Sequence, residues 1–63
     1  MRFKENEVVR IISDGKSIVK KGDIGTIIMV FDHPHEAYEV EFLDADGRVK
    51  TQCVFLPDEM EKL

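Results

Sequence analysis

Lys20-Lys21-Gly22-Asp23-Ile24-Gly25-Thr26-Ile27 is the stretch that decides the fold, because two glycines bracket an acid directly before an apolar run. Glycine tolerates positive φ, aspartate bonds to nearby backbone, and β-branched residues suit a pleated sheet. The stretch therefore predicts a turn at Gly22 and Asp23 that passes into a strand. Gly25 is expected where two backbones approach closely.

The strand that follows this turn, residues 24–31, is too β-branched for its length to be a helix. Its unbroken apolar character predicts a bent strand shared between two parts of a small barrel. A bulge near Ile28 and Met29 is expected to let Ile27 and Val30 both point inward.

Upstream of the turn, residues 8–12 are the first β-branched run, with Val9 and Ile11 expected in the core. Residues 13–22 read as an exposed polar loop in which Ile18 and Val19 are the only apolar anchors. Downstream, Pro34 interrupts the pattern, and residues 32–36 are expected to form a hairpin loop.

The clearest alternation in the chain places Tyr38, Val40 and Phe42 on one face of a strand and Glu39 and Glu41 on the other. One face of this strand is therefore expected to be dry and the other wet.

The sequence Asp44-Ala45-Asp46-Gly47 ends in a strong hairpin signal, Asp46-Gly47. A four-residue loop would set Phe42 opposite Val49 and Val40 opposite Thr51. We reject a three-residue loop here because it would slip the register and set Phe42 against Lys50.

The remaining sequence predicts a strand over residues 48–55, a 3₁₀ turn over residues 56–60 and a short closing strand up to Leu63. The fold class is therefore all-β: a single domain, residues 1–63, forming a five-stranded SH3-like (KOW-like) barrel with a 3₁₀ turn before the last strand.

Composition narrows the class of protein. The net charge of −4 would on average repel a nucleic-acid backbone, and the single cysteine cannot form an internal disulfide. With no apolar run of about 20 residues and no signal peptide, we expect a cytoplasmic protein that does not contact membranes. We expect a monomer or a weak homo-oligomer.

The chain resembles a bacterial family, domain of unknown function 4926, over most of its length. The matching segments are residues 7–10, 20–27, 36–42, 44–48 and 56–58. The glycine and acid pattern at residues 20–27 also resembles the KOW signature. The resemblance implies a small SH3-like barrel, and it carries over no catalytic residue.

Catalytic and metal sites are not favoured by the sequence. His33 and His35 lie two apart, but a zinc site needs three or four ligands in fixed geometry, so two exposed loop histidines are the simpler interpretation. Cys53 reads as a buried thiol because no base stands near it in sequence. We therefore expect no enzyme activity and no cofactor.

The leading hypothesis is a module that binds a partner protein through its loops or a strand edge, with Phe31, His33 and His35 among the candidate contact residues. The alternative is an RNA- or ribosome-binding module that uses Lys16, Lys20 and Lys21.

Overall fold

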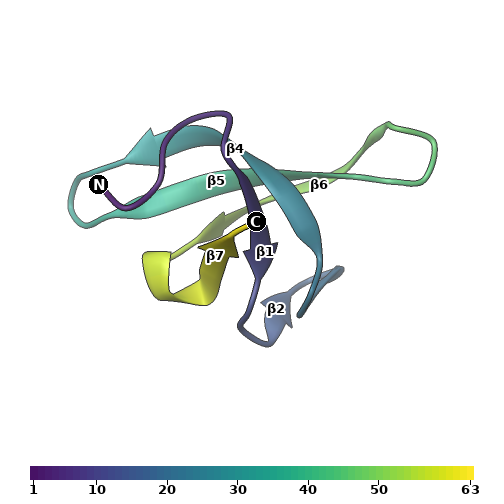
Figure 1. Ribbon diagram of the computed structural model, residues 1–63, viewed down its shortest axis with the longest axis horizontal. Helices are drawn as coiled ribbons and strands as arrows, with labels where there is room; N and C mark the ends of the chain where they lie inside the picture. The colour runs from purple at the N-terminus through teal and green to yellow at the C-terminus, as the bar shows by residue number, and fades with distance from the viewer.

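The computed structural model describes all residues from Met1 to Leu63 and contains only strands and one 3₁₀ turn (Figure 1). The elements are β1 (Val8–Ile11), β2 (Gly15–Lys16), β3 (Val19–Lys20), β4 (Ile24–Phe31), β5 (Ala37–Leu43), β6 (Val49–Phe55), η1 (Pro57–Glu59) and β7 (Met60–Lys62). The predicted all-β class and the 3₁₀ turn before the last strand are confirmed.

One five-stranded sheet in the order β6-β5-β4-β1-β7 makes up most of the fold, and every neighbouring pair is antiparallel. Strand β4 pairs with β1 from Ile24 to Thr26 and with β5 from Thr26 to Phe31. It therefore joins both parts of the sheet, as its unbroken apolar sequence predicts. Strands β6 and β7 form the two sheet edges.

A register shift between Ile27 and Met29 bulges β4, at the position expected from the sequence. Ile27 is fully buried and Val30 packs partly buried against the core. Just before the bulge, a Cβ on Gly25 would lie 2.6 Å from Val40 Cγ1 and 2.8 Å from the Glu41 carbonyl oxygen. The close backbone approach predicted at Gly25 is confirmed.

The core lies on the inner side of the curved sheet. It contains both residues predicted in β1 and all three from the dry face of β5. Its ten members are Phe3, Val9, Ile11, Val19, Ile27, Tyr38, Val40, Phe42, Phe55 and Met60. Cys53 packs partly buried against this cluster, as a thiol with apolar neighbours would.

The predicted register of the β5–β6 hairpin is wrong. Asp44 and Arg48 are joined by a backbone hydrogen bond of 2.8 Å, so the loop has the three residues that the sequence argument rejected. Leu43 then pairs with Val49, and Phe42 pairs with Thr51. Lys50 is left as an extra, bulged residue. Beyond this bulge, the inward side chains of β6 again lie opposite the inward side chains of β5. A four-residue loop would fit only an unbroken ladder, and the bulge at Lys50 breaks it.

The loop predicted over residues 13–22 contains a small hairpin, β2–β3, in which Lys16 pairs with Val19. Ser17 and Ile18 form its two-residue tip, and Ser17 has φ of +55°. Val19 anchors the hairpin in the core, whereas Ile18 is exposed. Ile18 is therefore not an anchor, because a tip residue has no sheet to pack against.

Candidate functional site

Lys16 is held against the sheet rather than extended into solvent. Its Nζ donates to the carbonyl oxygen of Val54, lies 3.5 Å from Glu59 Oε1 and sits 4.7 Å from the centroid of the Phe55 ring. These contacts fasten the β2–β3 hairpin to the end of β6. A phosphate binding to Lys16 would have to compete with all three.

The structure does not gather the three lysines into one basic surface. Lys16 and Lys20 lie on opposite faces of the β2–β3 hairpin, because Lys16 pairs with Val19 and Lys20 with Gly15. The backbone N–H of Lys20 donates to Asp23 Oδ2 over 2.9 Å, and its side chain is exposed. Lys21 is exposed in the turn that follows.

The turn residues that follow the lysines tie this segment to β1. The Gly22 N–H, at φ of +94°, donates to the Ile11 carbonyl oxygen over 2.7 Å. The Ile11 N–H in return donates to the Asp23 carbonyl oxygen over 2.9 Å. The Gly22-Asp23 turn thus fixes where β4 begins relative to the end of β1.

The second predicted turn closes the β5–β6 hairpin. Gly47 has φ of +84°, and the backbone N–H of Asp46 donates to Asp44 Oδ1 over 2.9 Å. The N–H of Arg48 donates to the same carboxylate oxygen over 3.0 Å. The carboxylate of Asp44 therefore has a structural role.

Phe31, His33 and His35 lie in or beside the loop that connects β4 and β5. Phe31 is half-buried, and both histidines are exposed. His33 Nε2 is 3.8 Å from Asp32 Oδ1. Nowhere in the chain do three side chains of His, Cys, Asp or Glu gather in a way that could hold a metal ion. The surface also carries no pocket.

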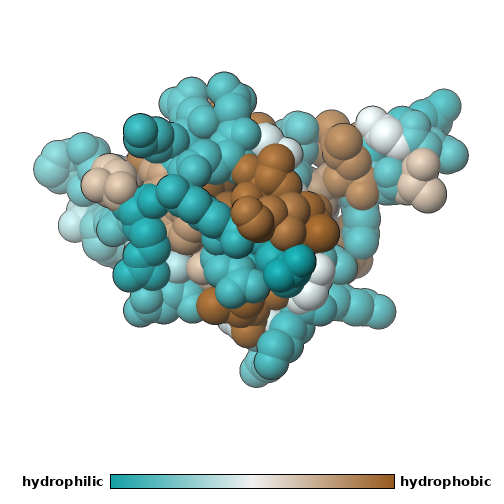
Figure 2. Space-filling view, in the orientation of Figure 1, coloured by the Kyte–Doolittle hydropathy of each residue, from teal (hydrophilic) through white to brown (hydrophobic).

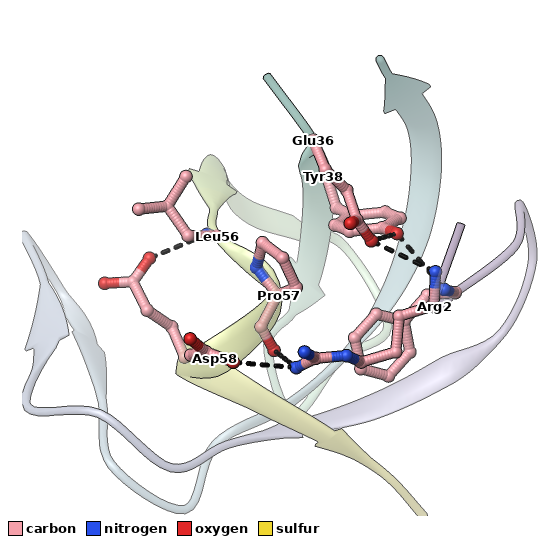
Figure 3. A network of polar contacts seen from close by, with 8 residues as sticks. Arg2, Glu36, Tyr38, Leu56, Pro57 and Asp58 are labelled. Carbon is pink, nitrogen blue, oxygen red and sulfur yellow. Dashed lines mark hydrogen bonds and ion pairs between the residues drawn. The ribbon is translucent and has the colours of Figure 1, made fainter.

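A polar network at the N-terminal end was missed by the sequence argument (Figure 3). The hydroxyl of Tyr38 donates to the carboxylate of Glu36 and accepts from the backbone N–H of Phe3 over 3.1 Å. The N–H of Arg2 donates to Glu36 Oε2 over 3.0 Å. Burial and this carboxylate raise the pKa of the Tyr38 phenol. Because Tyr38 and Arg2 donate to it, the pKa of Glu36 lies below its usual value.

The Arg2 guanidinium extends the network to the 3₁₀ turn. Its NH1 group donates to the Pro57 carbonyl oxygen over 3.0 Å and to Asp58 Oδ1 over 2.9 Å. The first residues of the chain are thereby joined to both β5 and η1 (Figure 3). No local pattern signals these contacts, because their partners are 34 to 56 positions apart in sequence.

The outer edge of β6 is the longest unpaired strand edge of the sheet. The Val54 carbonyl group faces this edge, because Lys16 reaches it from outside the β5 ladder. Backbone groups two residues apart on a strand face the same way, so Gln52 also presents its N–H and C=O there. On this edge, the side chains of Gln52 and Val54 are exposed.

The chain contains no helix with the length and apolarity needed to cross a bilayer. Comparison with family models gives a match to Domain of unknown function (DUF4926) over residues 5–62. No curated protein and no solved structure matches the chain. Since the match covers nearly all of its length, the chain belongs to this family.

Proposed function

We propose that this member of the DUF4926 family is a non-enzymatic interaction module that binds an extended segment of a partner protein along the open edge of β6. The observation that carries the proposal is the position of β6, a strand of seven residues at the edge of a five-stranded sheet. An unpaired edge offers a ready row of backbone donors and acceptors to an incoming strand.

The side chains on β6 favour such an addition. Gln52 and Val54 flank the edge on the outer face, while Thr51 and Cys53 are half-buried on the inner face. An added strand would therefore meet free backbone groups at Gln52 and partly covered apolar atoms, and it would displace Lys16 from the Val54 carbonyl oxygen. Main-chain hydrogen bonds would provide affinity, and alternate side chains would provide specificity.

We further propose that the curved sheet is a variant of the SH3-like (KOW-like) barrel and that the protein acts in the bacterial cytoplasm. The supporting features are the bent strand β4 shared by both parts of the sheet and the 3₁₀ turn before β7. Such small barrels carry their binding surfaces on loops and edges, which agrees with the role proposed for β6.

Protein binding is favoured over RNA binding by the state of Lys16. Of the three lysines in the basic segment, it already contacts Val54, Glu59 and Phe55. Tyr38, an aromatic ring of the kind that stacks on bases, is fully buried. The net charge of −4 also opposes a nucleic-acid backbone.

The proposal is tested by blocking the edge without breaking the sheet. Gln52→Pro removes an N–H that faces outward, so the β5 ladder is kept while strand addition is prevented. Gln52→Thr is the matched control, since it keeps the N–H and suits a strand. Affinity capture from host lysate should recover the same partner with the native chain and Gln52→Thr, and lose it with Gln52→Pro.

A folded Gln52→Pro variant that still captures the partner would refute binding at this edge. The RNA alternative is tested by a salt titration of binding to a pool of host RNA. Affinity that falls steeply with salt and disappears in a Lys20→Ala, Lys21→Ala double variant would establish phosphate contacts instead of a protein partner. Affinity for the protein partner should change little with salt.

A further inference from the structure

Three large apolar side chains lie exposed on the outer face of the sheet, at the end opposite to β6. Val8 in β1, Ile24 in β4 and Leu63 after β7 are 42%, 51% and 61% exposed. Figure 2 shows apolar side chains gathered where β1, the start of β4 and the C-terminal end meet. We call Val8, Ile24 and Leu63 the outer apolar patch.

Strand pairing makes these residues neighbours. Val8 pairs with Thr26, which places Ile24 at the diagonal position on the same face. The Leu63 N–H donates to the Val8 carbonyl oxygen over 3.3 Å. Val9 and Ile11 fill the inner face of β1, so the alternation leaves Val8 outward. The patch is thus a fixed feature of β1, β4 and the residue that follows β7.

The rim of the patch is electrically balanced, although the chain as a whole carries −4. Arg10, which pairs with Ile24 on one side and Glu61 on the other, places its NH1 3.1 Å from Glu61 Oε2. Two copies could therefore approach through this face without the repulsion expected between acidic proteins. Arg10 and Glu61 are both about half-exposed, so they form a surface doublet of opposite charges.

We propose that the outer apolar patch is a self-association surface on which a second copy of this chain packs through the same face. A two-fold axis brings each Arg10 close to the partner's Glu61, because a doublet of opposite charges is complementary to its own rotated copy. The two patches exclude water between them. Strand β6 lies at the far edge of the sheet and stays open in the dimer.

A dimer at this face must bury surface beyond the three side chains of the outer apolar patch. A specific interface buries about 600 Å² or more on each partner. That is about a seventh of the 4229 Å² accessible surface of this small chain. Domains of this length also bury a low share of their surface alone, so pairing adds apolar burial that a single copy lacks.

Sedimentation velocity over roughly 10 μM to 1 mM protein tests the proposal with a matched pair of variants. Ile24→Glu removes the patch, and Ile18→Glu places the same charge at the exposed tip of the β2–β3 hairpin. Ile24 and Ile18 are 51% and 49% exposed, so the two changes differ in place rather than in exposure. The native chain and Ile18→Glu should dimerise, and Ile24→Glu should weaken association by about tenfold or more.

A charge-exchange experiment distinguishes a second copy from other occupants and does not depend on Ile24. Arg10→Glu and Glu61→Arg should each be monomeric alone, because positions 10 and 61 then carry charges of the same sign and repel each other across the interface. Mixed in equal amounts, they should form a heterodimer. A native chain that stays monomeric throughout the range, an equal loss in both isoleucine variants, or a mixture that remains monomeric would overturn the proposal.

Discussion

At the scale of single residues, Tyr38 is the side chain on which burial and hydrogen bonding both depend. It has no exposed surface, and its ring packs edge-on against Phe3 with 5.3 Å between centroids. Its hydroxyl nevertheless needs partners, since a buried polar group without them costs about 1–3 kcal/mol. Glu36 and the Phe3 N–H meet that need. Phe3 is therefore the N-terminal residue that belongs to the core.

Stability should fall in acid because of Glu36. Its folded-state pKa is lowered from 4.5, so the unfolded chain binds the proton more readily. The stabilisation from Glu36 is complete above pH 4.5 and is lost as the pH falls. Urea unfolding between pH 7 and pH 3 should show a flatter decline in Glu36→Gln than in the native chain. Glu5→Gln, at an exposed position, should keep the native decline, and an identical profile for Glu36→Gln would contradict the assignment.

Replacing Gly25 or Gly47 by alanine should lower the free energy of unfolding by different amounts. At Gly25 the new Cβ would lie 2.6 to 2.8 Å from Val40, the Glu41 carbonyl and Phe42, so overpacking should cost about 3 kcal/mol. At Gly47 no atom lies within 4 Å, and only the positive φ of +84° is penalised, at about 1 kcal/mol. Chemical denaturation of both variants measures the difference. Equal losses of unfolding free energy in the two variants would show that steric crowding around Gly25 does not add to the cost of the substitution.

At the scale of elements, the sequence predicts where strands lie better than how they pair. The bounds of β4 follow from its unbroken β-branched run, and the facing of Tyr38, Val40 and Phe42 follows from simple alternation. The hairpin of β5 with β6 was predicted, but its register was not predictable in this way. It depends on a carboxylate, Asp44, that closes a three-residue loop, and on a bulge that local propensity does not reveal.

The bulge makes a prediction about deletions in β6. Removing Lys50 would place Val49 next to Thr51, which keeps Leu43 opposite Val49 and Phe42 opposite Thr51. The variant should still fold, and its free energy of unfolding should fall by about 1 kcal/mol or less, because the 3.9 Å contact of Lys50 Nζ with Asp23 Oδ2 is weak.

Deleting Gln52 is the matched comparison, because it also shortens β6 by one residue. Deleting Gln52 shifts the pairing by one residue on one side of the deletion, so side chains that face the core there would face solvent. We expect this variant to be unfolded by circular dichroism and the Lys50 deletion to be folded. Similar behaviour of the two would mean that the register is not set as described.

At the scale of the whole molecule, long-range contacts decide what the sequence could not predict. Each predicted binding residue has a definite place, yet Lys16 and Lys20 lie on opposite hairpin faces and the exposed His33 and His35 lie in the β4–β5 loop. Periodicity and sequence motifs give information only about residues that are close together along the chain. The joining of Arg2 to Asp58, and the lining of the β6 edge by Lys16, arise when distant segments meet.

The same long-range contacts make the N-terminal segment a condition for folding. Phe3 is 3% exposed, and truncating such a side chain to alanine costs about 3–5 kcal/mol. A domain of 63 residues has a total stability of only about 3–9 kcal/mol. Phe3→Ala should therefore lose half or more of its unfolding free energy in urea, whereas Phe3→Leu, which keeps most of the apolar volume, should lose about 1 kcal/mol. If Phe3→Ala retains native stability, the segment is an appendage and β1 to β7 fold without it.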